Sequence, residues 1–160
     1  MTLSKLKSMK KDRGFTIVEL LIVIVVIAIL AAIVIVAYNG VQKRANASTA
    51  KSNAESVQKI VEAYTADTSA GNGTYPSLAN LTGWTGGITR IPTGVTVNSA
   101  QLTSSAADGK TIQYVPKGTS PNFTGGCVAY WDASLGTPAA VYVYTGDATT
   151  GSNAATPTCS

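Results

Sequence analysis

The residue with the most distinctive chemical setting is a single acid inside an apolar segment. Glu19 precedes a run from Leu20 to Tyr38 in which every residue is apolar, alanine or tyrosine. A carboxylate at membrane depth costs about 2.5 to 3.5 kcal/mol on insertion scales, so such residues usually have a partner and a function. No side chain three or four positions from Glu19 is cationic. We expect a cationic partner from outside its helix. The simpler alternative is an acid that reaches water near the cytoplasmic interface.

Two cysteines offer a second kind of chemistry. Cys127 and Cys159 both lie beyond the apolar segment, and an even pair in an exported region favours a disulfide over two unrelated thiols. The chain has no histidine, and its seven acids after Gly14 are scattered singly. General bases and metal-ligand clusters of the usual kinds are therefore missing. The sequence predicts a protein that is not an enzyme and needs no cofactor or metal.

The net charge of +4 belongs entirely to residues 1–14. Residues 15–160 carry seven basic and seven acidic side chains, and are therefore neutral. Nucleic-acid-binding domains usually show a basic face, because phosphate neutralisation supplies much of their affinity. Binding of nucleic acid or glycan is not indicated. The charged side chains of the basic segment are Lys5, Lys7, Lys10, Lys11, Asp12 and Arg13.

The apolar segment is long enough to cross a bilayer. Counted from Phe15 it has only Thr16 and Glu19 as polar interruptions, and at about 1.5 Å per helical residue it spans the hydrocarbon layer. The basic N-terminal segment outweighs the Lys43-Arg44 pair on the other side, which places the N-terminus in the cytoplasm. A cleaved secretory signal is the competing interpretation, but its apolar stretch is normally shorter.

Helical periodicity continues beyond the apolar segment. Apolar residues recur on one face up to Tyr64, and no proline occurs before Pro76, which predicts one helix from 15 to about 68. Asn39-Gly40 is its weak point, because glycine and asparagine disfavour helix interiors, and a local bend is expected there. At 160 residues the chain has room for one domain and an extra element.

The C-terminal part predicts a small sheet. Strand-like segments occur at 111–115, 127–131 and 140–144, where β-branched and aromatic residues gather. Asp108-Gly109 is typical of a hairpin turn before the first of them, and Gly125-Gly126 of a break before the second. We expect an α+β fold in which an antiparallel sheet packs on the second half of the long helix.

The segment Gly14-Phe15-Thr16-Ile17-Val18-Glu19-Leu20 resembles the processing motif of type IV prepilins and related pseudopilins. The resemblance implies that a membrane peptidase cuts between Gly14 and Phe15 and methylates the new N-terminus at Phe15. It also implies that Glu19 pairs with the amino group of Phe15 in an adjacent subunit. A late disulfide between Cys127 and Cys159 and a pilin-like fold agree with the family. Many pilins carry a proline within the helix, which this chain lacks.

The same resemblance implies an organisation and a set of partners. Residues 1–14 would be a leader, 15–40 a transmembrane or filament-core helix, and 41–160 an extracytoplasmic domain with an amphipathic helix at 41–68. The partners would be other copies of the chain, the prepilin peptidase and the pilus assembly machinery. The precursor would lie in the cytoplasmic membrane and the product in a surface filament, of the kind used in adhesion, motility or DNA uptake.

Two alternatives to a pilin remain open, a type II secretion pseudopilin and a monomeric membrane-anchored binding module for glycan or nucleic acid. Four triplets match the glycosylation acceptor pattern, but such triplets are common by chance. Four strand aromatics could form a sugar-binding surface, although core packing is favoured. The triplets begin at Asn46, Asn72, Asn80 and Asn122, and the aromatics are Tyr130, Trp131, Tyr142 and Tyr144.

Overall fold

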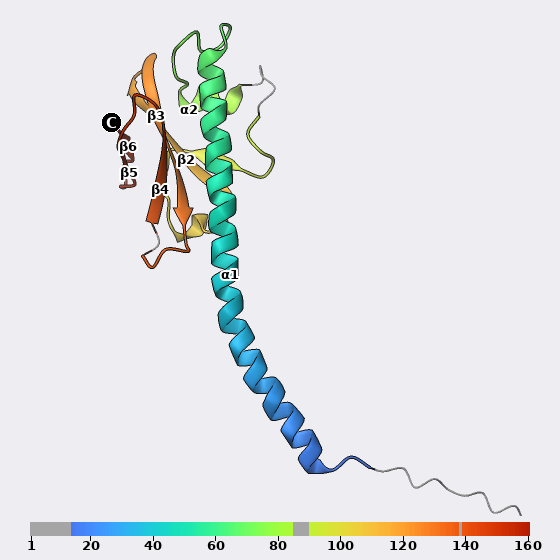
Figure 1. Ribbon diagram of the computed structural model, residues 1–160. Coiled ribbons are helices and arrows are strands. Elements are labelled where there is room, and N and C mark those ends of the chain that lie inside the picture. Colours follow the sequence, from blue (N-terminus) through green and yellow to red (C-terminus); the bar gives the residue numbers. More distant parts are fainter. Residues whose placement is uncertain (1–13, 85–89, 138) are drawn as a thin grey trace, which may run out of the picture. The chain divides into compact units, whose positions relative to one another are not determined.

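The computed structural model describes residues 14–84, 90–137 and 139–160. The predicted leader therefore lies, except for Gly14, outside the described residues. The chain divides into two compact units, Met1–Tyr38 and Asn39–Ser160. Most of the elements are labelled in Figure 1. They are α1 (Ile17–Ala66), α2 (Leu78–Gly83), β1 (Thr96–Asn98), the 3-10 turn η1 (Ser104–Ala106), β2 (Thr111–Thr119), β3 (Asn122–Asp132), β4 (Ala139–Gly146), β5 (Gly151–Ser152) and β6 (Thr158–Cys159).

The long helix α1 is 50 residues long, and each of its ends lies about two residues inside the predicted limits of 15 and 68. At its C-terminal end the Asp67 carbonyl accepts the N–H groups of Gly71 and Asn72, both at 2.9 Å, so the backbone turns away. Gly71 fits there because an added Cβ would lie 2.7 Å from the α-carbon of Thr65. The helix assignment continues through Asn39-Gly40, the predicted weak point.

The core of the second unit lies between α1 and one face of the sheet. Small residues Ala50 and Ala54, one turn apart and fully buried, allow the sheet to approach the helix closely. The loop at Gly109 also packs closely against α1, because a Cβ added to Gly109 would lie only 2.8 Å from the Asn46 carbonyl oxygen. The predicted packing of the sheet on the second half of the helix is confirmed (Figure 1). Other members of the core are Val57, Ile60, Val61, Ile112, Tyr114, Val128 and Tyr130.

The sheet has the order β1-β2-β3-β4 and is mixed. The three longer strands pair antiparallel and contain the three predicted strand segments, whereas β1 pairs parallel with β2. Asp108-Gly109 does form a turn, with a positive φ of 77° at Gly109, but it is not a hairpin turn as predicted. Parallel strands need a crossover. Here the chain returns through η1 before it enters β2.

The Gly125-Gly126 pair also lies elsewhere than predicted. Instead of preceding β3 it lies within that strand, opposite Lys117 and Pro116 of β2. An added Cβ on Gly126 would lie 2.6 Å from the ring of Tyr114. The glycine therefore makes room for a core ring and does not mark a strand boundary.

The second face of the sheet is covered by the C-terminal segment and by the region around η1. Leu102, Ala106 and Ala129 are buried there, with Trp131 and Tyr142 packed against them. Tyr142 stacks on Tyr144 at a ring distance of 6.1 Å. Of the four strand aromatics, Tyr130 is in the main core, Trp131 and Tyr142 are partly buried, and Tyr144 is 37% exposed. Core packing is thus confirmed for Tyr130 and holds in part for Trp131 and Tyr142.

Tyr114 is the largest fully buried side chain, and its hydroxyl donates to the Pro76 carbonyl at 2.8 Å. Burial, assisted by the neighbouring Tyr75, raises the pKa of Tyr114 above its ordinary value. The folded protein therefore holds this proton more tightly than the unfolded chain does. The resulting stability is fully present below the unfolded pKa of about 10 and is lost as the pH rises through the folded pKa.

We predict that Tyr114→Phe lowers the free energy of unfolding at pH 7 by about 0.5 to 1.5 kcal/mol, because one hydrogen bond is lost. The same substitution should also make stability fall less steeply above about pH 10, because one raised phenol pKa is removed. Urea unfolding followed by tryptophan fluorescence at neutral and alkaline pH measures both effects. An alkaline slope equal to that of the wild type would contradict the prediction.

Candidate functional site

The start of α1 is closed by hydrogen bonds between Thr16 and Glu19. The Thr16 backbone N–H and hydroxyl both donate to Glu19 Oε2, at 2.8 and 2.7 Å. In return the Glu19 backbone N–H lies 3.2 Å from Thr16 Oγ1, which accepts its hydrogen bond. This reciprocal arrangement is a capping box, in which a threonine before the helix and a glutamate three residues later satisfy each other's backbone groups. It explains why α1 begins at Ile17 and not at the predicted residue 15.

The capping box gives Glu19 a local partner that was not predicted from the sequence. The sequence predicts an outside partner because no cationic side chain lies three or four positions from Glu19. In the structure Thr16 instead contributes two uncharged hydrogen-bond donors. The Thr-x-x-Glu spacing was the signal that could have found it. A carboxylate in the first turn also faces the positive end of the helix dipole. Within the described part of the chain, no ion pair involves Glu19.

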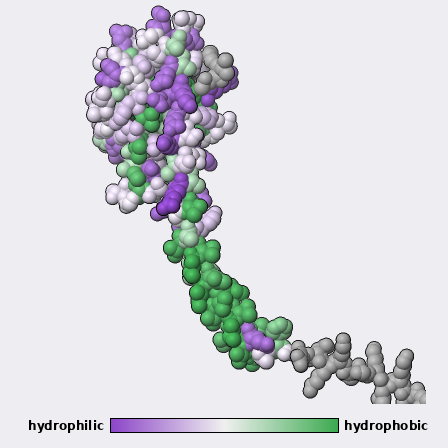
Figure 2. All heavy atoms as spheres, viewed as in Figure 1, coloured by the Kyte–Doolittle hydropathy of each residue, from purple (hydrophilic) through white to green (hydrophobic). Residues whose placement is uncertain are grey.

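The first half of α1 has no polar face. From Ile17 to Tyr38 all its large side chains are exposed, with Val25 still 48% and Val36 75% accessible. The face of this segment that Figure 2 shows is almost wholly hydrophobic. A helix that is apolar all round is normally surrounded by lipid or by other apolar helices. This is the one helix among the described residues that is long and apolar enough to cross a membrane. It fits a membrane-anchored precursor.

Phe15 and Gly14, the predicted cleavage pair, precede the helix. Phe15 is 82% exposed, and an added Cβ on Gly14 would meet nothing within 4 Å. Both residues therefore lie outside any packed structure, on the side of the capping box away from the helix. Cleavage between them and methylation at Phe15 stay predictions.

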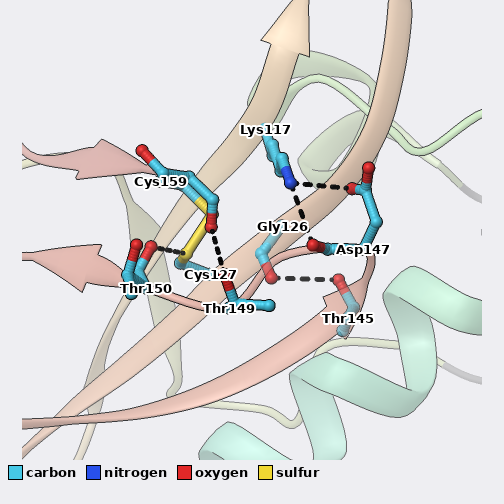
Figure 3. A network of polar contacts seen from close by, with 9 residues as sticks. Lys117, Gly126, Cys127, Thr145, Asp147, Thr149, Thr150 and Cys159 are labelled. Atoms are coloured by element: carbon cyan, nitrogen blue, oxygen red, sulfur yellow. Dashed lines mark hydrogen bonds and ion pairs between the residues drawn. A yellow bond between two sulfur atoms is a disulfide. The ribbon is translucent and has the colours of Figure 1, made fainter.

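At the far end of the chain, a disulfide joins Cys127 of β3 to Cys159 of β6, the pairing that the sequence favours. The two residues are 32 positions apart, and closing a ring of this size stabilises a fold by about 3 to 4 kcal/mol in the chain-entropy description. Figure 3 shows the disulfide beside Thr149 and Thr150. Both threonine N–H groups donate to the Ser160 carbonyl oxygen, at 2.8 and 3.0 Å, so the last residues are fixed beside the sulfur bridge.

The same ring is fastened at two further points. The Lys117 ammonium donates to the Asp147 carbonyl oxygen at 2.9 Å and lies 3.4 Å from its carboxylate (Figure 3). The pKa of Asp147 is lowered, mainly by a hydrogen bond from the Thr124 side chain and to a smaller extent by Lys117. Asn153 joins the ring to the segment before η1. Its side-chain oxygen accepts from the Leu102 N–H at 2.6 Å, and its side-chain nitrogen donates to the Leu102 carbonyl at 2.8 Å. No local pattern in the sequence points to Asn153, because its partner lies 51 residues away.

Comparison with known proteins found a match for one part of the chain, near its N-terminus. Residues 9–35 match the family model described as the prokaryotic N-terminal methylation motif. The matched span contains Gly14, Phe15, Thr16 and Glu19 together with most of the apolar run. No curated protein and no solved structure matched the chain.

We predict that Thr16→Val loosens the first turn of α1 by about 1 kcal/mol, the usual cost of losing a capping side chain. Amide hydrogen exchange of Glu19, measured on the full chain in detergent micelles, should become about fivefold faster. Thr16→Ser keeps the hydroxyl and serves as the matched control, with near wild-type exchange. Equal exchange in the valine and serine variants would refute the capping role of Thr16.

Proposed function

We propose that this chain, which resembles type IV pilins and pseudopilins in its N-terminal methylation motif, is the precursor of a filament subunit. In this proposal a prepilin peptidase cuts between Gly14 and Phe15 and methylates the Phe15 amino group. The processed chain then assembles with copies of itself through the apolar half of α1. The observation that carries the proposal is the match of residues 9–35 to the methylation motif. A role as a structural subunit, and not as an enzyme, agrees with that motif.

Cleavage would supply the cation that Glu19 lacks. Before cleavage the Phe15 nitrogen is part of a peptide bond, and the leader carries the four net positive charges of the chain. After cleavage each subunit has a new amino group at Phe15 and one carboxylate at Glu19. Opposite charges attract strongly in an apolar environment, but desolvation removes much of the gain. The main benefit of the pair is therefore the register between neighbouring subunits.

The capping box prepares Glu19 for this exchange. Both contacts from Thr16 end on one carboxylate oxygen, Oε2. The other oxygen, Oε1, accepts no hydrogen bond from the described residues, so an incoming ammonium group has an acceptor without breaking the helix cap. While the subunit waits in the membrane, Thr16 keeps the carboxylate from being wholly unpaired in an apolar setting.

The apolar half of α1 would serve in two environments. In the precursor its all-round apolar surface suits a lipid bilayer, with the N-terminus in the cytoplasm and the second unit outside. In the filament the same surface would contact equivalent helices of other subunits. Lipid tails are about as apolar as leucine, so the exchange depends on close packing and on the few polar contacts, and not on the hydrophobic effect. This makes the pairing of Glu19 decisive for assembly.

The proposal predicts that Glu19→Ala leaves cleavage largely intact but lowers the yield of filaments at least tenfold, because the buried ion pair is lost. Cleavage is measured by the size of the protein in the membrane fraction. Filament yield is measured in sheared surface material and by electron microscopy with antibody labelling.

Val18→Ala is the matched control, because it truncates an adjacent apolar side chain without removing a charge. It should form filaments at close to the wild-type level. Normal filament yield from Glu19→Ala would contradict the proposed pairing. A wild-type protein that is labelled only as dispersed single molecules would instead indicate a membrane-anchored binding module.

A further inference from the structure

A hollow lies in the second unit where the loop after α1 meets the turn between β2 and β3. It has a volume of about 400 Å³ and is lined by residues from both segments and from the last turns of α1. A second hollow of about 300 Å³ adjoins it and shares the lining residues Tyr64, Ala70 and Asn80. Sites for small molecules usually fall in the range of about 300 to 1,000 Å³. The two hollows together are thus large enough for a small ligand.

The walls of the hollow are held in place by two hydrogen bonds and one contact between aromatic rings. The Tyr75 N–H donates to the Phe123 carbonyl at 3.1 Å, which joins the loop after α1 to β3. The Tyr114 hydroxyl fixes the next residue, Pro76, from within the core. Tyr64 is buried and makes an edge-to-face contact with Trp84 at 5.5 Å. A site that is formed before the ligand arrives avoids the entropic cost of ordering on binding.

The lining has a distinct chemical character, because it combines aromatic rings with uncharged polar groups. Tyr64, Tyr75 and Phe123 supply the rings, and Asn80 and Asn122 supply side-chain amides. No hydrogen bond between described residues uses either of these amides, so each offers two donors and an acceptor. Among the described residues, none that lines either hollow is charged.

From this combination we infer that the hollow is a binding site for a neutral saccharide. A sugar ring has an apolar face of C–H groups that packs on aromatic rings, and hydroxyl groups that bond with amides and hydroxyls. A charged ligand would lose its hydration without gaining an opposite charge. A purely apolar ligand would leave the amides of Asn80 and Asn122 unpaired. A neutral saccharide satisfies both parts of the lining.

The two hollows share Asn80 and the ring of Tyr64, so the site can hold more than one sugar ring. A disaccharide is therefore the smallest probe that tests the whole site. This inference does not depend on the filament, because every lining residue belongs to the unit Asn39–Ser160. The aromatic strand residues considered in the sequence, from Tyr130 to Tyr144, are not part of this site.

The test is a titration of the full ¹⁵N-labelled chain in dodecylphosphocholine micelles, a detergent without a sugar headgroup. The probes are lactose, cellobiose and N,N′-diacetylchitobiose, each raised to millimolar concentration. At least one of them should shift the backbone amide signals of Tyr75, Asn80 and Asn122, while sialyllactose, which is lactose extended by an acidic sugar residue, should bind at least tenfold more weakly than lactose. Absence of shifts with all three neutral probes, or shifts confined to another surface, would overturn the inference. Equal binding of sialyllactose would overturn the claim of neutrality.

Variants separate the site from other surfaces. The double variant Asn80→Ala with Asn122→Ala should weaken binding of the effective probe at least tenfold, because both free amides are removed. Asn46→Ala is the matched control, since Asn46 also begins an acceptor triplet but lies on α1 away from the hollow, and its binding should be unchanged. Undiminished binding by the double variant would refute the assignment. If that variant fails to fold, the shifts measured on the wild-type chain still decide the matter.

Discussion

The placement of one carboxylate in an apolar helix is the constraint on which the proposed assembly depends. Glu19 is the single charged residue between Phe15 and Tyr38, and it sits in the first turn of α1, where the helix start itself provides donors. Thr16 satisfies one oxygen of the carboxylate through two hydrogen bonds and so makes the acid tolerable in an apolar environment. A charge that is only partly satisfied remains ready for a stronger partner. The proposed amino group of a neighbouring Phe15 meets that requirement, and it exists only after cleavage.

The second unit is held together by contacts of its own, so the proposed transfer of the apolar half of α1 from lipid to filament need not alter it. Its core lies wholly within Asn39–Ser160, between the buried face of α1 and the strands β2, β3 and β4. The far face of the sheet is closed by a C-terminal ring that is fixed by the disulfide, by the Lys117–Asp147 pair and by Asn153. Among the described residues, the extended apolar surface is thus confined to one half of one helix. This unit carries seven basic and six acidic side chains, and the face of it shown in Figure 2 is mostly polar.

Features that depend on local pattern could be predicted from the sequence. The absence of proline before Pro76 and the regular apolar spacing placed α1 to within about two residues at each end. The three strand segments were found because β-branched and aromatic residues gather in them. The parallel strand β1 was missed, since Thr96–Asn98 is only three residues long and its pairing is set by tertiary packing. Gly125-Gly126 was predicted to mark a strand boundary. Its actual role is to leave space for the Tyr114 ring, which lies on another strand and cannot be inferred from the residues next to the glycines. The capping box can be read from the sequence as Thr-x-x-Glu, because its partners are only three residues apart.

In the proposed function the mature molecule is a processed chain found in a filament. The most direct measurement is the intact mass of the protein recovered from sheared surface filaments. The mass should correspond to a chain that begins at Phe15, carries one added methyl group and lacks two hydrogens because Cys127 and Cys159 are joined. A chain that begins at any other residue, or an unmethylated Phe15, would contradict the claim.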